Sequence, residues 1–457
     1  KIEMDESLGY YGQFNLMHTM MEKYPDVTVL ASTGGWAASR SLWLVTDSEA
    51  NMRKFASSAV EFVRKYGFDG IDIDFEFPSE TSGSGNPGDF DLSESRRSGI
   101  SDRYTQLIRI LRETFDAAAK EDGKYYWVNS DFLDYLDFVS IMSYDYHGGW
   151  NAYVENQANL YPDPADTETK QMALPTLGFD WSYKYYRGKI HSEKILMGVP
   201  YYTRGWSNVS GGDGTGLHGT SNTPATGNEN IWCDLDTNEK EVPAGANPLW
   251  HVMNLMKEDA NYEEVWDDVG KVPHIWNSAT KTFLTYENTR SVQERIHYVE
   301  ENNLGGVLIW VMHGDYDYDE AAGKYVVGDT LTTMFHDQFA SMDAAQITSD
   351  IDLNGTPLDF SVDFGGKYDH PNYTYSIKVT NNTKEEIPAG WTLTFDLPNS
   401  AVFTSSWGGT YSVEQSAKRE FSTVSLSAGE WQALGAGESV ELQGMIKLNF
   451  AGAKNFK

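Results

Sequence analysis

Residues 69–76 read Asp-Gly-Ile-Asp-Ile-Asp-Phe-Glu, and this stretch decides how the rest of the chain is interpreted. Acidic and apolar side chains alternate along it with a period of two, which is typical of a β-strand. In a strand, Asp72, Asp74 and Glu76 share one face, while the isoleucines and the phenylalanine between them share the other. The stretch therefore predicts three carboxyl groups in a row on one side of a strand.

Three carboxyl groups this close cannot all ionise in a partly desolvated site, so we expect their pKa values to be driven apart. A carboxyl group that keeps its proton near neutral pH can act as a general acid. Two other interpretations stay open from the residues alone: an acidic edge strand exposed to solvent, and a divalent-metal cluster of oxygen ligands. The apolar opposite face favours a strand that is covered on both sides.

The charge balance of the 457-residue chain limits its partners. With 67 acidic and 35 basic residues, its formal charge of -32 argues against nucleic acid and against anionic membrane surfaces. No apolar run approaches the roughly 18 residues of a membrane span, and the single cysteine, Cys233, excludes an intrachain disulfide. The 14 Trp, 27 Tyr and 21 Phe residues favour flat aromatic platforms, with a rich hydrophobic core as the alternative.

Helix and strand patterns alternate over the first 338 residues. A helix over 14–24 is expected to turn these side chains inward: Phe14, Leu16, Met17, Met20 and Met21. A second helix is expected to begin at the capping pattern of Thr46 and to end at Gly67. Further helices are expected at 103–120 and 292–301, and apolar strands at 27–31, 136–145, 195–202 and 307–312. Such units indicate a parallel sheet and suit a barrel whose site lies at the carboxyl ends of its strands.

The alternation breaks between residues 207 and 286, where Gly, Asn, Thr and Ser are frequent. We interpret 207–286 as a small α+β insertion within a catalytic region that covers 1–338. The alternative is a long disordered loop, which the many aromatic residues argue against. After a linker at 339–349, short alternating segments in 350–457 predict an all-β sandwich.

Five motifs in chain order resemble glycoside hydrolase family 18, and its bacterial chitinases in particular. The motifs are Ser32-x-Gly34-Gly35, Asp69-Gly70-x-Asp72-x-Asp74-x-Glu76, Met142-x-Tyr144-Asp145, Gly198-Val-Pro-Tyr-Tyr-x-Arg204-Gly-Trp206, and Gly305-Gly306 followed by Trp310. The resemblance implies an α/β fold class with a (β/α)8 TIM barrel. The insertion is similar to one that deepens the substrate cleft in one branch of the family.

The resemblance also implies a mechanism. Glu76 would protonate the glycosidic oxygen while the carbonyl oxygen of the substrate's own N-acetyl group attacks the anomeric carbon, because this family is a substrate-assisted exception among glycosidases. Asp74 would accept the acetamido N–H, Asp72 would share a proton with Asp74, and Tyr144 would donate to the acetamido oxygen. The configuration would be retained through an oxazolinium intermediate, and neither a cofactor nor a metal ion is expected.

Carry-over from the family also suggests contacts to the sugar. Trp310 would form the floor under a distorted sugar ring. The other expected substrate contacts are Asp145, Tyr202, Arg204, Met142, Trp36 and Trp206. A structural role is the alternative for each of them: Met142 is expected to pack beneath the site, and ordinary packing is an equal alternative for Trp36 and Trp206.

The C-terminal segment resembles bacterial carbohydrate-binding sandwiches, through motifs around Trp391 and Trp407. In such modules one tryptophan lies in the core, and others form a flat surface that stacks on polymer chains. We expect Trp391 in the core, and Trp407 and Trp431 on the surface. An immunoglobulin-like spacer that binds no ligand is the alternative.

Two features depart from the family pattern. Only 31 residues precede Ser32, whereas the family has two strands before this motif. The stretch between Gly123 and Asp137 is also short for the family's fifth strand and the helix after it. We therefore expect residues upstream of this sequence, and a missing segment near Val128–Asn129.

The predicted function is that of a secreted chitinase, with its signal peptide outside this sequence, acting as a monomer on chitin or chitooligosaccharides. Neither a nucleic acid nor a membrane is expected as a partner. Two alternatives stay open: an endo-β-N-acetylglucosaminidase acting on N-glycans, and a non-hydrolytic chitin-binding lectin. Lectins with this fold typically lack the acid, whereas Glu76 is present.

Overall fold

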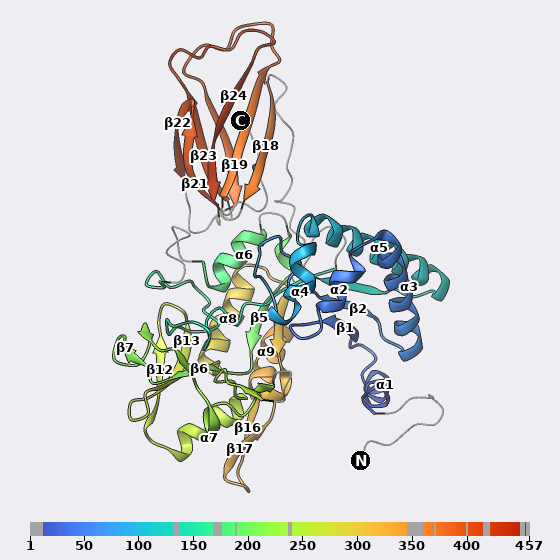
Figure 1. The fold of residues 1–457 in the computed structure, drawn as a ribbon, viewed down its shortest axis with the longest axis vertical. Coiled ribbons are helices and arrows are strands. Elements are labelled where there is room, and N and C mark those ends of the chain that lie inside the picture. The colour runs from blue at the N-terminus through green and yellow to red at the C-terminus, as the bar shows by residue number, and fades with distance from the viewer. Residues whose placement is uncertain are drawn as a thin grey trace. The chain divides into compact units, whose positions relative to one another are not determined.

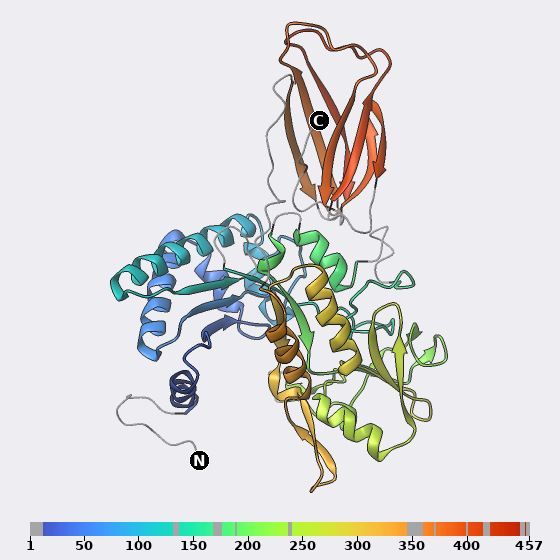
Figure 2. The same cartoon turned by 180° about the vertical axis from the view of Figure 1, so that it is seen from behind.

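The computed structural model describes residues 12–130, 137–167, 176–187, 190–235, 240–344, 360–369, 372–398, 401–414, 421–447 and 453. The chain divides into two compact units, residues 1–140 and 141–457. Figure 1 and Figure 2 show the ribbon from opposite sides. Every helix among the described residues is too short or too polar to cross a lipid bilayer.

Unit 1 contains a three-stranded parallel sheet with the order β1-β2-β3. The strands are β1 (Leu30–Gly34), β2 (Gly70–Asp74) and β3 (Trp127–Ser130). The helices beside this sheet in Figure 1 are α2 (Arg40–Val45), α3 (Glu49–Tyr66), α4 (Phe90–Ser93) and α5 (Ile100–Asp122). The parallel pairing expected for this part of the chain is therefore confirmed. Val128 and Asn129 lie within β3, and residues 131–136 lie outside the described part.

Helix α3 leads directly into the carboxylate strand. Its N-cap is Ser48, whose side chain accepts a hydrogen bond from the Asn51 N–H, so the expected cap at Thr46 was wrong. Thr46 instead ends α2. Because Gly67 has a φ of 77°, in the left-handed region that glycine tolerates, α3 ends there as expected and β2 begins at Gly70.

The first helix forms where it was expected, but its apolar side chains are not buried. In α1 (Gln13–Lys23), Phe14, Leu16 and Met20 are 36%, 48% and 53% exposed. Phe14 stacks on Tyr66 of α3, with 4.2 Å between the ring centroids. The prediction of an inward face was wrong because periodicity identifies an apolar face without showing what covers it.

A second three-stranded sheet has the order β15-β5-β4. The strands are β4 (Val139–Ile141), β5 (Ile195–Pro200) and β15 (Gly306–Trp310), and β15 pairs with β5 in parallel. Unit 2 also contains α6 (Phe179–Arg187), α8 (Thr289–Glu301), α9 (Thr330–Ser341) and the hairpin of β16 (Tyr316–Asp319) and β17 (Lys324–Val327). Helices α8 and α9, gold and brown in Figure 2, pack against each other.

A buried ion pair anchors α8 within unit 2. Glu287 and Arg295 have side chains that are 0% exposed, and Arg295 Nε lies 3.0 Å from Glu287 Oε2. The guanidinium also donates to the carbonyl oxygen of Ala158 at 2.6 Å. A buried charge is stable only when it is paired and hydrogen-bonded, and Arg295 meets this requirement through Glu287 and Ala158. The network therefore ties α8 to the chain that follows β4.

The described residues of 207–286, which were expected to form an insertion, contain strands, the helix α7 and a short 3-10 helix at Gly227–Glu229. Their main sheet is antiparallel, with the order β12-β13-β14-β6-β9. Its strands are β6 (Arg204–Ser207), β9 (Thr223–Pro224), β12 (Tyr262–Asp267), β13 (Val272–Asn277) and β14 (Thr282–Thr285). The other elements are β7 (Ser210–Gly211), β8 (Gly219–Thr220), β10 (Asp234–Leu235), β11 (Glu241–Val242) and α7 (Leu249–Glu258).

The C-terminal region forms two antiparallel sheets, β18-β19-β24-β21 and β20-β23-β22. The strands are β18 (Phe360–Asp369), β19 (Asn372–Asn381), β20 (Thr392–Pro398), β21 (Val402–Trp407), β22 (Gly409–Glu414), β23 (Phe421–Ala428) and β24 (Ser439–Lys447). Apolar side chains from both sheets form one buried cluster, which is the expected β-sandwich. Trp391 packs against this cluster, whereas Trp407 and Trp431 are 51% and 80% exposed, so these three placements are confirmed.

Candidate functional site

The row of carboxyl groups lies at the carboxyl end of β2. Along Gly70–Asp74 the apolar side chains are buried and the acidic ones are half-buried, as the alternation predicted. Because the register places Ser32 of β1 opposite Asp72, the Ser32 hydroxyl donates to Asp72 Oδ2 at 2.8 Å. The first member of the row is therefore oriented by its neighbouring strand.

The glycine turn after β1 explains how the next carboxyl group is held. Gly34 has a φ of 115°, and a Cβ there would lie 1.9 Å from the carbonyl oxygen of Asp74. No other residue fits such a close approach of two backbones. The N–H of Gly35 donates to the same carbonyl oxygen at 2.6 Å.

Ser39 supports the same strand end and escaped the sequence reasoning. Its hydroxyl accepts a hydrogen bond from the N–H of Glu76 at 2.9 Å and lies 2.9 Å from the carbonyl oxygen of Gly35, to which it donates. Ser39 is 0% exposed, so these bonds do not compete with water. It belongs to no motif of the sequence, and only the return of the chain after β1 brings it to Glu76.

The neighbouring carboxyl groups shift the pKa of Asp74. Burial raises this pKa, the negative charge of Asp72 raises it further, and a hydrogen bond with Glu76 lowers it, with a net increase. A hydrogen bond between two carboxyl groups requires a proton, because two ionised carboxylates have no donor. The end of β2 is therefore built to keep a proton among acidic side chains.

Trp36 lies close to this strand end within unit 1. Its indole is 48% exposed and approaches the ring of Phe77 edge-on, at 6.4 Å between centroids. The side chain of Asn86 donates to its carbonyl oxygen at 2.8 Å. Trp36 is thus a surface aromatic rather than a core residue.

Unit 2 carries a second group of candidate residues, which bond to one another. Asp145 follows β4 with a φ of 58°. Arg204 donates to both of its carboxylate oxygens at 2.7 Å, and the Tyr202 hydroxyl donates to Oδ1 at 2.9 Å. The ring of Tyr144 meets Tyr202 edge-on, at 6.1 Å between centroids. Asp145, Tyr202 and Arg204 were predicted as sugar contacts and hydrogen-bond to one another, whereas Tyr144, predicted as a catalytic donor, contacts the ring of Tyr202.

The remaining candidates in unit 2 differ in exposure. Trp310 ends β15, opposite Pro200 at the end of β5, and is 54% exposed, so it is not a core residue. Met142 is half-buried just after β4. Trp206 is 0% exposed and donates its indole N–H to the carbonyl oxygen of Asn151 at 2.9 Å. The expected sugar contact at Trp206 is therefore corrected to its alternative, packing beneath the insertion.

Parallel strands that carry carboxyl groups and an exposed tryptophan at their carboxyl ends, followed by a β-sandwich, define a modular hydrolase of the TIM-barrel class. The family Glycosyl hydrolases family 18 matches residues 1–315, and the chain belongs to it. The family Chitinase C matches residues 324–457. The resemblance inferred from five motifs is thereby confirmed.

Solved and curated relatives agree with this assignment. The crystal structure of a family 18 chitinase from Chromobacterium violaceum superimposes with a TM-score of 0.81 at 33% identity, covering 99% of this chain and 80% of that one, which confirms the expected TIM-barrel fold. Chitinase A1 of Niallia circulans is 28% identical over 328 residues, which are 66% of this chain and 43% of that protein. Chitinase B of Serratia marcescens is 26% identical over 339 residues, 66% of this chain and 67% of that protein. The chain thus spans less than half the length of the Niallia relative.

Proposed function

We propose that this chain hydrolyses β-1,4-linked N-acetylglucosamine polymers, and so acts as a chitinase. The observation that carries the proposal is the row of carboxyl groups at the end of β2, where burial and the charge of Asp72 raise the pKa of Asp74, in a chain that belongs to family 18. The similarity to proteins named chitinases supports the same substrate.

The proposed reaction needs no protein nucleophile. Glu76 gives its proton to the glycosidic oxygen as the bond to the anomeric carbon breaks, and the carbonyl oxygen of the substrate's acetamido group forms a new bond to that carbon from the opposite face. Water then attacks the oxazolinium ion and gives its proton to Glu76, which restores the acid and retains the configuration. The cationic intermediate is stabilised by the neighbouring carboxylates.

The other roles follow the family resemblance. Asp74 accepts the acetamido N–H, and Asp72, oriented by Ser32, shares charge and proton with Asp74. Tyr144 donates to the acetamido oxygen. The 54% exposure of Trp310 supports a role as a flat platform for a sugar ring.

The test compares acetylated chitin oligosaccharides with fully deacetylated chitosan of the same length. The wild-type chain should cleave the first and leave the second intact, since chitosan lacks the attacking carbonyl group. Glu76→Gln should lower kcat on chitin oligosaccharides about 10²–10⁴-fold with little change in their binding. Glu61→Gln, an exposed carboxamide substitution on α3, is the matched control and should retain the wild-type rate. Equal cleavage of chitosan would contradict the substrate-assisted reaction.

The two alternative functions give different products. An endo-β-N-acetylglucosaminidase would release a high-mannose glycan from a glycoprotein faster than it cleaves chitin oligosaccharides. A chitin-binding lectin would bind chitin oligosaccharides without releasing any product. We expect cleavage of chitin oligosaccharides and no glycan release, measured with equal enzyme concentration and reaction time.

Since the preferred substrate is an extracellular polymer, export of the enzyme is part of the proposal.

A second function, adsorption to chitin, is supported by the C-terminal sandwich. Trp431 is 80% exposed, and although its ring lies close to Gly429, most of its apolar surface faces solvent. Trp431→Ala should leave the free energy of unfolding within about 0.5 kcal/mol of wild type and weaken adsorption to insoluble chitin several-fold. Glu430→Ala, the exposed neighbour, should adsorb normally. Unchanged adsorption of the Trp431 variant would favour the spacer alternative.

A further inference from the structure

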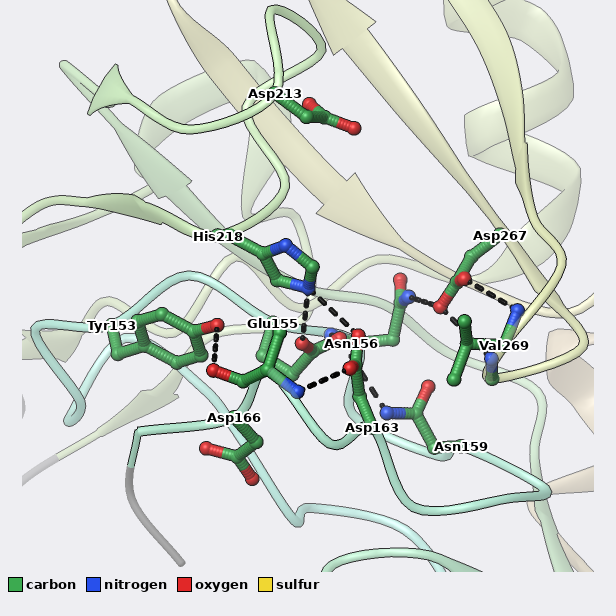
Figure 3. Close-up of polar contacts among 12 residues, drawn as sticks. Tyr153, Glu155, Asn156, Asn159, Asp163, Asp166, Asp213, His218, Asp267 and Val269 are labelled. Atoms are coloured by element: carbon green, nitrogen blue, oxygen red, sulfur yellow. Dashed lines mark hydrogen bonds and ion pairs between the residues drawn. The ribbon is translucent and has the colours of Figure 1, made fainter. Parts of the chain in front are cut away.

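A buried polar cluster lies where the chain after β4 meets the β7–β8 hairpin, and Figure 3 shows its side chains converging. We refer to Glu155, Asp163 and His218 as the Glu155 cluster. Two backbone hydrogen bonds hold its edges together: Val154 N–H donates to the Gly219 carbonyl at 3.0 Å, and His218 N–H donates to the Val154 carbonyl at 2.9 Å. All of these residues belong to unit 2.

Three ligand-type atoms in the cluster point at one another. His218 Nε2 lies 2.8 Å from Asp163 Oδ2 and 3.2 Å from Glu155 Oε2. Among the described residues, these three form the one group of His, Cys, Asp or Glu side chains in which one ligand atom from each residue lies within 4.8 Å of the others. Glu155 and Asp163 are 0% and 4% exposed, whereas the His218 side chain is 29% exposed and can be reached from solvent.

A single proton does not satisfy this arrangement. Nε2 of an imidazole carries one hydrogen, and the geometry directs it to Asp163 Oδ2. Glu155 Oε2 is fully buried, points into the same space and accepts no hydrogen bond; it has only the ion-pair approach to His218. A buried carboxylate oxygen without a donor is costly, whereas one metal ion can contact all three atoms at once.

The surrounding charges also favour a cation. Asp166 and Asp267, both drawn in Figure 3, are buried in addition to the two carboxylates of the cluster. The burial of Asp267, together with the charges of Glu155 and Asp163, raises its pKa. Two histidines lie against these carboxyl groups. His218 contacts Asp163, and His147 Nε2 lies 3.1 Å from Asp166 Oδ2. The four carboxyl groups of this region thus outnumber its two histidines, so the surroundings favour a cation.

We propose that Glu155, Asp163 and His218 bind one divalent transition-metal ion of the zinc class, through Oε2, Oδ2 and Nε2. One imidazole nitrogen with two carboxylate oxygens is a ligand set that zinc accepts, whereas calcium takes six to eight oxygens. In tetrahedral zinc sites the ligand atoms lie roughly 3.3–3.4 Å apart. The 3.2 Å between His218 Nε2 and Glu155 Oε2 fits this spacing, and the 2.8 Å to Asp163 Oδ2 widens by about half an ångström when the ion replaces the shared proton. Water would be the fourth ligand, as in zinc sites with three protein ligands.

The ion would have a structural role. His218 precedes β8 in the insertion, and the two carboxylates belong to the chain after β4, so a shared ion fastens one segment to the other. No metal was expected from the sequence because the ligands come from separated positions and match no metal-binding spacing. The competitor is a proton, since the neighbouring carboxylates, Glu155 first and then Asp163, raise the pKa of His218 to about 9.

The test uses the full chain after removal of metals with a chelator. Isothermal titration with zinc chloride should show one equivalent bound, and zinc should raise the melting temperature above its value in chelator. Glu155→Gln and His218→Gln should each weaken zinc binding at least about 100-fold, more than the loss of a supporting contact around a metal site. Asp213→Asn, a carboxamide substitution on the same hairpin, should bind like wild type.

Cobalt(II) gives a second readout that is independent of stability. Wild type and Asp213→Asn should develop visible absorption bands of a cobalt ion with nitrogen and oxygen ligands, and His218→Gln should not. His218 is partly exposed, so this variant is expected to fold, which circular dichroism in chelator checks. Absence of zinc binding by the wild type, or equal affinity in all variants, would overturn the proposal and leave the cluster as a proton-bridged ion triad.

Discussion

Asp74 is the last residue of β2 and Asp145 lies just after β4, yet their surroundings differ. Asp74 lies beside Asp72 and shares a hydrogen bond with Glu76, so its neighbours are acidic. Asp145 receives two hydrogen bonds from Arg204 at 2.7 Å and one from Tyr202. The same side chain is held by a proton in one region and by a guanidinium group in the other.

This difference separates reactivity from stability. A carboxyl group among like charges is kept ready to exchange a proton, at a cost in folding free energy. A carboxylate paired bidentately with arginine stays ionised and stabilises the fold. We therefore expect substitutions of the two aspartates to move activity and stability in different directions.

Asp74→Asn is the substitution with the largest expected effect. The carboxamide keeps the shape and can still accept from Glu76, but it removes the negative charge that would stabilise a cationic intermediate. We expect kcat on chitin oligosaccharides to fall about 10²–10³-fold, the range for loss of one electrostatic contact to a transition state. Steady-state kinetics measures the loss, and Asp268→Asn is the control because the Asp268 side chain is 81% exposed. A loss below tenfold would remove Asp74 from the reaction.

The same variant has an opposite effect on stability. Because the pKa of Asp74 is raised in the folded state, folding binds protons here, and the group disfavours folding increasingly as pH rises through that pKa. Asp74→Asn removes this penalty, so its melting temperature should exceed that of wild type at pH 7. The difference should shrink as pH falls and vanish below about 3.8, the ordinary pKa of the group, where the folded and unfolded states of the wild type are both protonated. A lower melting temperature at pH 7 would contradict the comparison.

Asp145→Asn should have the reverse signature. The new amide places an N–H₂ group against the Arg204 fork, so one charge-assisted hydrogen bond is lost and the guanidinium keeps no counter-charge. We expect the free energy of unfolding to fall by about 1.5–3 kcal/mol, and kcat to change less than in Asp74→Asn. Chemical denaturation of both variants measures the contrast. A stabilised Asp145 variant would mean that this pair does not hold the fold.

Much of unit 1 was accessible to sequence reasoning because its signals are local. The alternation in β2 needs only neighbouring residues, and it correctly assigned the buried and half-buried faces of Gly70–Asp74. The end of α3 at Gly67 needs only the left-handed conformation that glycine tolerates. The family motifs then linked these elements to a known fold, which the structural match confirms.

Other features depend on contacts between distant residues, which no local pattern encodes. Asp145 follows β4 and pairs with Arg204 at the start of β6. The sequence showed two polar candidates but not that they bind each other. Ser39 reaches Glu76 only because the chain turns back after β1. Trp206 carries a family motif, but its burial follows from the strands that cover it, including Phe283 at 5.8 Å between ring centroids.

Arg204→Lys is the most conservative change and has the smallest expected effect. Lysine keeps the positive charge but cannot make two parallel hydrogen bonds to Asp145, and it loses the planar group that lies 5.2 Å from the ring of Trp150. We expect a loss of about 0.5–1.5 kcal/mol in the free energy of unfolding. Arg290→Lys is the matched control. Arg290 also lies over a tryptophan, Trp266, but its side chain is 57% exposed, and its 3.7 Å distance to Asp268 is too long for a hydrogen bond. If both lysine variants are equally stable, the positive charge alone holds Asp145. The contrast between Asp145 and Asp74 then depends on the sign of the neighbouring charge and not on the two parallel hydrogen bonds of the Arg204 guanidinium group.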